Sequence, residues 1–395
     1  MKRILLLFAL LFGLSLPISA AELVDTLRAD AAAADTVGRR TFFRRIIDYY
    51  RGTNRKPKRF DVVVLPGPHY SSTMGFGLGF AATGLYSCDP SDPTLPRSNA
   101  ALKGGFTSKG QIKAIVDGTN IFPRERYRMD YRIAFCTFPT QFWGIGTASC
   151  RLDANETDYR LNYIDAQGRF LFRLAPKLYA GPYVRYRYMV ARNVETFPED
   201  SPAPGIALWQ GQQLRQRGLT AGFSLTCDTR DNMLGATRGF FVRLDQTFTP
   251  AATAGGRGFA TTQFEIDGYR RLWRGAVLAA QLCTELNYGN PAWCMLAQID
   301  GTKRMRGYYE GRYRDKHCID AQIELRQHIR KRHGVVAWIG GAEYFSRADA
   351  LRWRDILPDG GFGYRWQCRP GMNIRIDYGF TRHGGTLLFN IAEAF

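Results

Sequence analysis

Five histidines are the side chains best suited to proton transfer near neutral pH: His69, His317, His328, His333 and His383. His328 shares one face of an alternating segment with Asp320 and Glu324, and a carboxylate can orient a histidine as a general base. No serine in an acyl-transfer context lies nearby, and the sequence holds no P-loop, dinucleotide fingerprint or metal-ligand motif. We therefore expect hydrogen-bonded lumenal or turn histidines, and a protein that is not an enzyme and has no catalytic residue, cofactor or metal site.

The eight cysteines are the second group with reactive potential. None forms a CxxC pair, and no cluster of histidine and cysteine has the spacing of a zinc site. The separations of Cys136 from Cys150 and of Cys283 from Cys294 fit neighbouring strands as well as disulfides. Unpaired cysteines on strands are the expectation, and the sequence defines no connectivity.

A third group of reactive side chains lies in the segment 303–316, KRMRGYYEGRYRDK. Its two glycines, four arginines and three tyrosines are typical of a loop. The segment that follows alternates strictly, with acids, arginines and Gln322 on one face and aliphatic residues such as Ile319 and Ile323 on the other. A period of two indicates either a half-buried strand of a soluble sheet or a strand between lipid and a polar lumen.

The same alternation recurs along the rest of the chain, and many runs reach ten residues, the length that a tilted membrane strand requires. Strands of a soluble sandwich are usually ~5–6 residues long. Every second connection is short, such as FPRE and APK. The connections between them include long ones at 139–156, 193–213 and 290–315. Because only a closed barrel leaves no unpaired edge in lipid, the prediction for 59–395 is an all-β, 16-stranded antiparallel transmembrane β-barrel. The predicted strands lie near 60–70, 74–86, 97–108, 111–121, 126–138, 157–173, 177–192, 214–229, 238–249, 258–272, 275–289, 316–330, 334–346, 359–368, 371–382 and 385–395.

Two segments precede the predicted barrel. Residues 1–20 have the basic start, apolar run and small-residue end of a signal peptide, and the run is shorter than the ~20 residues of a spanning helix. Residues 21–58 predict a short periplasmic helical segment and linker, since apolar side chains recur at helical spacing among arginines over 41–51. This helix is expected to lie at the membrane interface, to cap the barrel mouth or to be a mobile tail.

The net charge of +19 restricts the partners. Basic residues are distributed over the predicted strands and form no single patch, which argues against nucleic-acid binding. An exported basic chain rich in tyrosine and phenylalanine indicates contact with outer-membrane lipid and lipopolysaccharide.

Four motifs together carry a family resemblance. Met305-Arg306-Gly307-Tyr308 resembles the (V/I)-R-G-(F/Y) motif in the sixth extracellular loop of the BamA/TamA outer-membrane assembly-factor superfamily (bacterial surface antigen barrels). The predicted strand order also places these residues in the sixth loop on the side of the long loops. The segment 227–245 resembles the family's D-x-R-D-N-x-x-x-P-x-x-G signature, with Ala236 in place of proline. The segment 138–147, FPTQFWGIGT, resembles its aromatic-glycine loop. The ending LLFNIAEAF resembles the family's C-terminal assembly signal. Phe395 is expected on the same face as Leu387, Phe389 and Ile391. Glu393 stands where the family has an aromatic residue.

The resemblance implies a lumenal site. Arg306 would fold back into the lumen and pair with Glu324 on the predicted strand at 316–330. The family has a second, acidic anchor on the next strand, where Gly340 stands here, so that anchor is expected to be missing or replaced by Glu343. The segment before the barrel is too short for a periplasmic POTRA domain, which implies a POTRA-less member of the family.

The resemblance also implies a function: inserting or translocating other outer-membrane or exported proteins through a lateral seam between the first and last strands. Pro66 and Pro68 would weaken that seam, since proline removes a ladder donor, and Phe389, Ile391 and Phe395 would form its other side. Unfolded client proteins and a separate periplasmic partner are the implied partners. The alternative is a passive or gated channel, or a structural barrel that works with such a partner.

Overall fold

The computed structural model describes residues 60–71, 75–92, 95–194, 212–369, 372–391 and 393–395. The predicted signal peptide and the helix predicted at 41–51 lie outside these residues. The chain divides into the units Met1–Asn54 and Arg55–Phe395, and every described strand belongs to the second unit.

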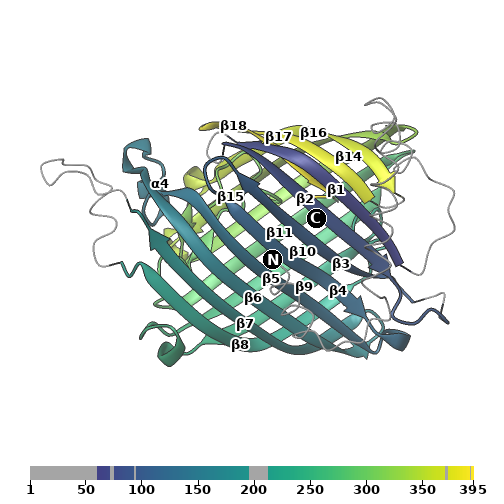
Figure 1. The fold of residues 1–395 in the computed structure, drawn as a ribbon, viewed down its shortest axis with the longest axis horizontal. Coiled ribbons are helices and arrows are strands. Elements are labelled where there is room, and N and C mark those ends of the chain that lie inside the picture. The colour runs from purple at the N-terminus through teal and green to yellow at the C-terminus, as the bar shows by residue number, and fades with distance from the viewer. Residues whose placement is uncertain (1–59, 72–74, 93–94, 195–211, 370–371, 392) are drawn as a thin grey trace, which may run out of the picture. The chain divides into compact units, whose positions relative to one another are not determined.

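In the described part of the chain, sixteen long strands form one antiparallel sheet in which each strand pairs with the next long strand (Figure 1). The described ladders run from β1 to β18 and include none between these two strands, although Val62 and Val64 of β1 have further contacts. The strands are β1 (Phe60–Ser71), β2 (Gly75–Tyr86), β3 (Ser98–Thr107), β4 (Ile112–Ile121), β5 (Tyr127–Phe142), β6 (Thr157–Ala175), β7 (Leu178–Arg192), β8 (Arg215–Asp228), β9 (Gly239–Thr249), β10 (Phe259–Arg271), β11 (Ala276–Gly289), β14 (His317–Arg330), β15 (His333–Phe345), β16 (Leu357–Arg369), β17 (Met372–Thr381) and β18 (Gly384–Ile391). The predicted all-β antiparallel fold is confirmed.

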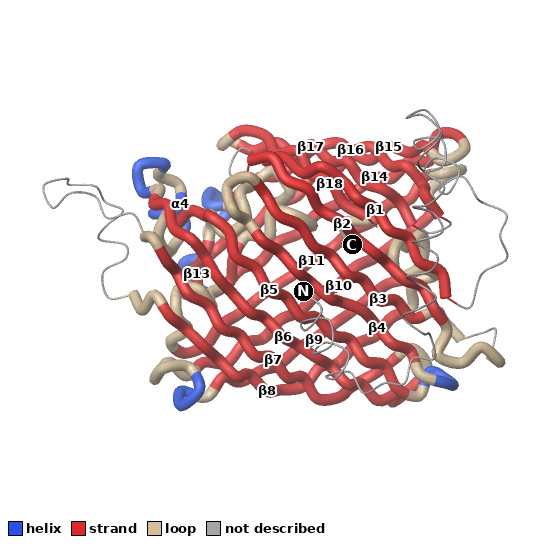
Figure 2. Tube along the Cα trace, in the orientation of Figure 1, coloured by secondary structure: helices blue, strands red, loops and turns tan. Residues whose placement is uncertain are grey.

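Short elements occupy the connections. The two-residue strands β12 (Ala297–Gln298) and β13 (Arg314–Asp315) pair within the connection between β11 and β14. Figure 2 shows the helical turns in blue at the ends of the strands, among them α4 (Thr147–Cys150). Within the described residues, no helix is long and apolar enough to cross a membrane.

The two faces of the sheet have opposite polarity. On β14, Asp320, Gln322 and Glu324 are buried, whereas the side chain of Ile323 is 50% exposed. Large apolar side chains on other strands are exposed in the same way: Phe76, Leu78, Phe80, Phe106, Phe135, Ile164, Val184, Phe223, Phe240, Phe248, Ile339, Phe362, Ile376 and Phe389. Because exposed apolar area is unfavourable in water by roughly 25 cal/mol per Å², a continuous band of this kind suits hydrocarbon.

The polar face is concave, since its side chains reach across strands that are not neighbours. Arg128 on β5 pairs with Asp228 at the end of β8 at 3.0 Å, and Arg243 on β9 pairs with Asp130 on β5 at 3.2 Å. In a flat sheet β5 and β9 would be about 19 Å apart at ~4.8 Å per strand. The sheet therefore curves around a polar interior, which we call the lumen.

Two predicted boundaries need correction. β5 runs on to Phe142, and β18 ends at Ile391 instead of continuing to Phe395. Glu393 N–H donates to Leu234 O at 3.1 Å, and the Phe395 ring packs against Tyr269, with 6.1 Å between ring centroids. Phe395 therefore turns toward the lumen and does not share the outer face with Phe389, because the buried carboxylate of Glu393 draws the tail inward.

The seven described cysteines that can be assessed are free, as expected. Four of them lie on strands, at Cys136, Cys227, Cys283 and Cys318.

Ile164 lies in the middle of β6 on the outer face, 39% exposed, beside the buried Asp165. We expect Ile164→Arg to lower the free energy of unfolding in phospholipid vesicles by ~2–4 kcal/mol, because the charge would enter hydrocarbon. Ile164→Met, which conserves volume, should cost less than ~1.5 kcal/mol. Urea unfolding of both variants measures the difference, and equal stability would show that this face does not contact lipid.

Candidate functional site

The candidate site is built by the connection between β11 and β14, residues 290–316, which we call loop 6. Its two arms are held together by main-chain hydrogen bonds from Ile299 N–H to Tyr313 O and from Gly311 N–H to Ile299 O, both 3.0 Å. Met305 adopts a positive φ of 51° just before Arg306. The arms and this turn present Arg306, Gly307 and Tyr308 to the polar face of the sheet.

The guanidinium of Arg306 is fully buried. Its Nη1 atom lies 2.7 Å from Oε2 of Glu324 and 3.0 Å from Oδ2 of Asp377. Its Nη2 atom donates to Oε1 of Gln322 at 3.0 Å, and the cation lies 3.7 Å from the centre of the Trp338 ring. A buried arginine is tolerated only when charges and hydrogen bonds compensate its desolvation, and this site supplies two carboxylates, an amide and an aromatic face.

The main chain at the tip of loop 6 is also anchored. The N–H groups of Arg306 and Gly307 donate to the two carboxylate oxygens of Asp359 on β16, at 3.2 and 2.9 Å. Nε1 of Trp338 donates to the same carboxylate at 2.9 Å. Asp359 thus fixes the tip and the indole that stacks on Arg306.

The prediction that Glu343 replaces the second anchor is wrong. Glu343 accepts a hydrogen bond from Arg352 N–H at 2.6 Å, whereas the anchoring acids are Asp359 and Asp377 on β16 and β17. β15, the strand that carries Gly340, contributes the ring of Trp338 to the Arg306 site. The anchoring acids come from the next two strands of the curved sheet.

Gly307 must be glycine because the tip touches β17 directly. A Cβ at Gly307 would lie 2.6 Å from Thr381 Cγ2, and a Cβ at Gly379 would lie 2.6 Å from Gly307 N. Thr386 on β18 donates to Gly307 O at 3.1 Å. Tyr308 donates from its hydroxyl to Pro358 O at 2.9 Å, and burial raises the pKa of Tyr308 to about 12.

The ion pairs continue beyond Arg306 to the end of the described chain. Glu324 accepts from Nε of Arg326 at 2.6 Å, and Asp377 is paired with Arg365. Arg365 in turn donates to Glu393 at 2.7 Å. Loop 6 and the tail that follows β18 therefore belong to one network of alternating charges.

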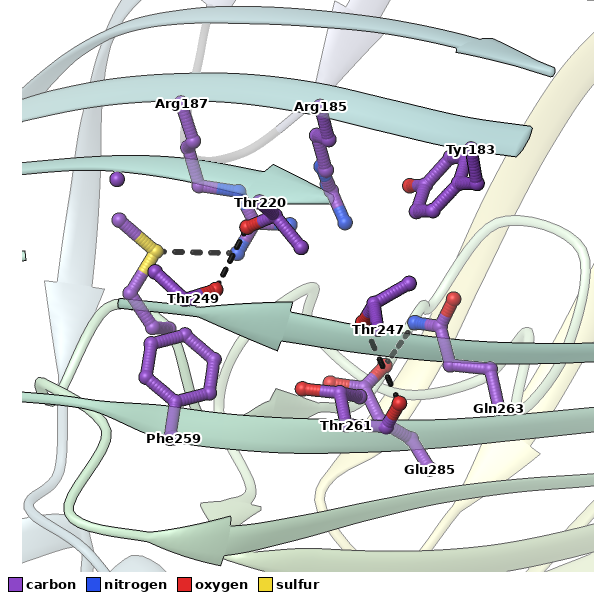
Figure 3. A pocket seen from close by; sticks show the side chains of 12 residues that line it. Tyr183, Arg185, Arg187, Thr220, Thr247, Thr249, Phe259, Thr261, Gln263 and Glu285 are labelled. Carbon is purple, nitrogen blue, oxygen red and sulfur yellow. Dashed lines mark hydrogen bonds between the residues drawn. The ribbon is translucent and has the colours of Figure 1, made fainter. Parts of the chain in front are cut away.

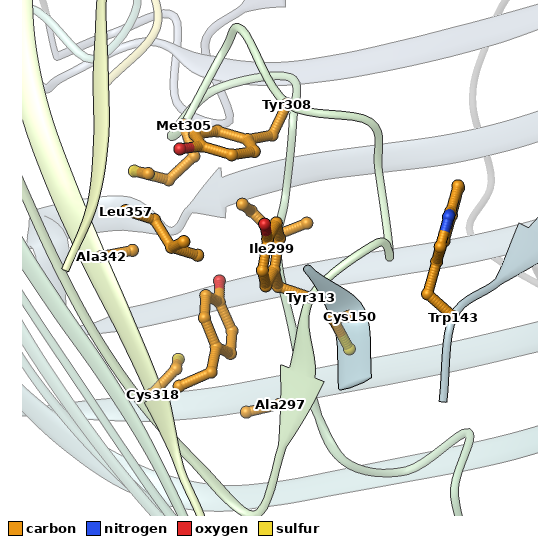
Figure 4. Packing of buried hydrophobic residues seen from close by; sticks show 11 residues of the cluster. Trp143, Cys150, Ala297, Ile299, Met305, Tyr308, Tyr313, Cys318, Ala342 and Leu357 are labelled. Carbon is orange, nitrogen blue, oxygen red and sulfur yellow. The ribbon is translucent and has the colours of Figure 1, made fainter. Parts of the chain in front are cut away.

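The connection between β5 and β6 packs onto loop 6. Thr147 donates to Tyr344 O at 2.8 Å, and Gly146 N–H donates to Arg314 O at 2.9 Å. Figure 4 shows one buried cluster that joins this connection to loop 6 and the wall, and its residues are Trp143, Cys150, Ala297, Ile299, Met305, Tyr308, Tyr313, Cys318, Ala342, Tyr344 and Leu357. The two motif segments at 138–147 and 303–316 thus fill part of the lumen together.

The motif turn between β8 and β9 supports the network from the opposite end of the strands. Asp231 accepts from Thr237 N–H at 2.8 Å, and Gly239 has a φ of 98°, where a Cβ would lie 2.3 Å from Thr229 O. Arg326 donates to Ala236 O at 3.3 Å. The turn is therefore attached to the strand that carries Glu324.

A polar recess in the wall lies beside the base of loop 6 (Figure 3). Arg187 on β7 donates to the sulfur of Met295 at 3.5 Å, and Gln263 donates to Glu285 at 2.9 Å across β10 and β11. These contacts position loop 6 and do not pair a nucleophile with a base.

The other predicted residues are placed as follows. Pro66 and Pro68 lie on β1 opposite Phe80 and Leu78, and the side chains of both prolines and of Ile391 are outside the described part. His328 donates to Lys331 O at 2.8 Å. Sequence reasoning missed Asp359, Trp338 and the role of Glu393, and it recognised Asp377 only as one polar residue of an alternating strand.

An antiparallel sheet with an apolar outer face and a lumenal Arg-Gly-Tyr loop defines the class: a curved all-β protein whose sixth loop folds inward. The model of the Omp85 superfamily domain matches residues 117–354, more than half of the chain. The chain belongs to the Omp85 superfamily, and the resemblance inferred from the motifs is confirmed. Comparison with curated proteins finds no match.

Solved structures show the same fold at low identity. The crystal structure of BamA from Haemophilus ducreyi lacking POTRA domains 1–3 has a TM-score of 0.53 and 13% identity, over 85% of this chain and 70% of that chain. CdiB from Acinetobacter baumannii has a TM-score of 0.50 and 9% identity, over 85% and 60% of the two chains. CdiB from Escherichia coli has a TM-score of 0.50 and 12% identity, over 86% and 62%. The chain thus spans about three fifths of the CdiB chains.

Gly379→Ala is expected to displace the tip of loop 6, because the new Cβ would meet the main chain of Gly307. The tip should then become accessible to protease in folded protein, which mass spectrometry of the cleaved chain detects. Gly168→Ala on β6, where a Cβ would meet nothing within 4 Å, is the matched control. Equal protection of both variants would contradict a close contact of loop 6 with β17.

His383, in the turn between β17 and β18, predicts a pH dependence. Its Nε2 lies 2.8 Å from the Tyr313 hydroxyl, and its Nδ1 lies 3.8 Å from Asp153. Burial, and then the positive charge of Arg312, lower the pKa of His383. In the unfolded chain the pKa of this histidine is ~6.5, so the unfolded chain takes up the proton more readily than the folded protein does. The contribution of His383 to folded stability is therefore present above pH ~6.5 and is lost as the pH falls.

Wild-type protein should therefore lose more thermal stability between pH 7.5 and pH 5.0 than His383→Gln, which cannot titrate. Heat-modified mobility on gels measures both midpoints. The same pH response in both proteins would show that His383 does not sense this range.

Proposed function

We propose that β1 and β18 meet, so that the sheet closes into a sixteen-stranded transmembrane barrel in the outer membrane of a Gram-negative bacterium. The apolar outer face and membership of the Omp85 superfamily support this assignment. In Figures 1 and 2, β1 and β18 are both drawn at the upper edge of the sheet. Closure would also give hydrogen-bond partners to the main-chain N–H and C=O groups at the edges of β1 and β18, for which hydrocarbon offers none.

The barrel inserts or translocates other outer-membrane or exported proteins through a lateral seam between β1 and β18. The observation that carries this function is the attachment of loop 6 beside the last strand: Gly307 packs on Gly379 of β17 and accepts from Thr386 of β18. Loop 6, attached at this place, keeps the wall folded while pairing between β1 and β18 is replaced by pairing with a client strand. A client strand adds to a seam edge by β-augmentation, and the prolines of β1 weaken the pairing with which the client competes.

The proposed partners are membrane lipid and lipopolysaccharide, unfolded client proteins and a separate periplasmic protein. The proposal includes no enzyme activity and no nucleic acid. The alternative, a passive or gated channel, predicts ion conductance. Packing of loop 6 and the β5–β6 connection inside the lumen favours low conductance and hence the assembly role.

Depletion of the protein, followed by quantitative proteomics of the outer membrane, tests the function. We expect selective loss of other barrels or surface proteins, restored by wild type and not by Arg306→Ala. The substitution removes the buried cation that Glu324 and Asp377 share and leaves each acid with fewer partners, at a cost of up to ~3–5 kcal/mol. Lys303→Ala, an exposed position in the same loop, is the matched control and should restore the proteome.

The amount of each variant in the outer membrane is measured in parallel, so that lost function is separated from lost folding. An unchanged proteome together with altered uptake of small solutes would leave the channel as the function.

A further inference from the structure

Two neighbouring short turns lie at the ends of the strands opposite loop 6. Residues 272–275 join β10 to β11, and residues 331–332 join β14 to β15. The turns are adjacent because β11 pairs with β14, and His328 N–H donates to Gly275 O at 2.7 Å. The sequences at these turns, RRLWRG (270–275) and HIRKRHG (328–334), contain six arginine and lysine residues and no acid.

The partners of these six cations differ. Arg271 pairs with Asp231 at 3.7 Å, and the guanidinium of Arg332 lies 5.9 Å from the centre of the Trp366 ring. The other four are exposed and make no ion pair within the part of the chain that the structure describes: Arg270, Arg274, Arg330 and Lys331. The excess of positive charge at these turns therefore rests on four side chains and does not include Arg271 or Arg332.

The register of the sheet places two of the four on the outer face. Arg270 lies opposite Leu278 of β11 and follows the exposed Ile266 by four residues on β10. Arg330 lies opposite His333 of β15, whose outer face continues with the exposed Val335. Paired residues of a sheet point to the same side, and a register shift in β14 just before Arg330 allows this pairing. Both cations therefore lie on the face that is apolar along the rest of these strands.

Aromatic side chains with bonded polar tips lie on the same face. Trp273 is 58% exposed, and its Nε1 donates at 2.8 Å to Oε1 of Gln327, which shares the outer face of β14 with Ile323. On the next strands, Nδ1 of His333 lies 2.5 Å from the hydroxyl of Tyr364. Exposed rings of this kind at the end of an apolar band are typical of the boundary between hydrocarbon and headgroups.

We propose that this surface, the rim patch (Arg270, Trp273, Arg274, Arg330 and Lys331), binds the headgroup of an anionic phospholipid such as phosphatidylglycerol. Guanidinium groups bind phosphate oxygens in a bidentate manner, and the acyl chains of the same lipid lie along the apolar face that includes Ile266 and Ile323. A free phosphate or an acidic polypeptide would use the cations alone and leave this apolar area uncovered, which favours the lipid. The inference rests on the membrane contact of the proposed function and names the lipid class.

Quenching of tryptophan fluorescence by brominated lipid tests the proposal. The purified full chain is placed in phosphatidylcholine vesicles that contain either brominated phosphatidylglycerol or brominated phosphatidylcholine, and the signal of Trp273 is the difference between wild type and Trp273→Phe. We expect half-maximal quenching of Trp273 at a mole fraction about fivefold lower for brominated phosphatidylglycerol than for brominated phosphatidylcholine. High salt should reduce this preference, because it screens exposed charges.

Arg270→Gln/Arg330→Gln should remove most of the preference, since it takes two cations from the outer face. Arg270→Lys/Arg330→Lys keeps the charges and should retain a preference, which separates loss of charge from loss of fold. Arg352→Gln/Arg354→Gln is the matched control, because it removes two exposed arginines from the β15–β16 connection at the other end of the strands. It should show the preference of the wild type.

Equal quenching by the two lipids in the wild type would overturn the proposal, and so would the same loss of preference in both glutamine variants. Relief of quenching by millimolar glycerol 3-phosphate would overturn it in favour of a free-phosphate site, and relief by a deca-glutamate peptide in favour of an acidic polypeptide. Absence of quenching by either lipid would contradict the membrane contact itself. Because none of these readouts measures protein assembly, loss of the lipid preference alone leaves the proteomic test unaffected.

Discussion

The buried guanidinium of Arg306 imposes the constraint on which the rest of the lumen depends. An isolated cation in a low-dielectric interior is strongly unfavourable, so its partners must all be in place at once. Here they come from four strands, β14 to β17, and from the tip of loop 6 itself. The loop can occupy the lumen only when these strands have their native curvature, and the curvature in turn is fixed by the loop. Folding of the wall and docking of the loop are therefore one event in energetic terms.

Glu393 extends this dependence to the last strand. Its carboxylate joins Arg365, which also pairs with Asp377, the partner of Arg306. Partly satisfied polar networks are costly, so removing the tail from Arg365 would disturb charges that hold loop 6. A glutamate in place of an aromatic residue near the end of the chain is explained by this position: an aromatic side chain suits the outer face, whereas this residue lies inside.

Much of the fold could be predicted from the sequence because a period of two in polarity determines both the strands and the face that each side chain occupies. The observed β2, β4 and β7 differ from the predicted ranges by one residue at most at each end. The partners of Arg306 could be predicted only in part. Alternation places Asp377 on the polar face, but which acid meets a loop depends on how far the sheet curves and where the loop ends. Asp359 lies in a run of glycines without alternating charge. The predicted face of Phe395 is wrong because the alternation of β18 ends at Ile391.

Many of the charged side chains at the two ends of the lumen have partners within the chain, and this compensation bears on function. Near loop 6, Arg306, Arg326 and Arg365 each have an acidic partner within the chain, and Asp359 accepts hydrogen bonds from main-chain and indole N–H groups, so that region is closed electrostatically as well as sterically. At the opposite end of the strands, Arg271 pairs with Asp231 at 3.7 Å and Glu393 pairs with Arg365 at 2.7 Å. A lumen filled by loop 6 and compensated in charge favours the proposed exchange of strands at the seam over free passage of solutes.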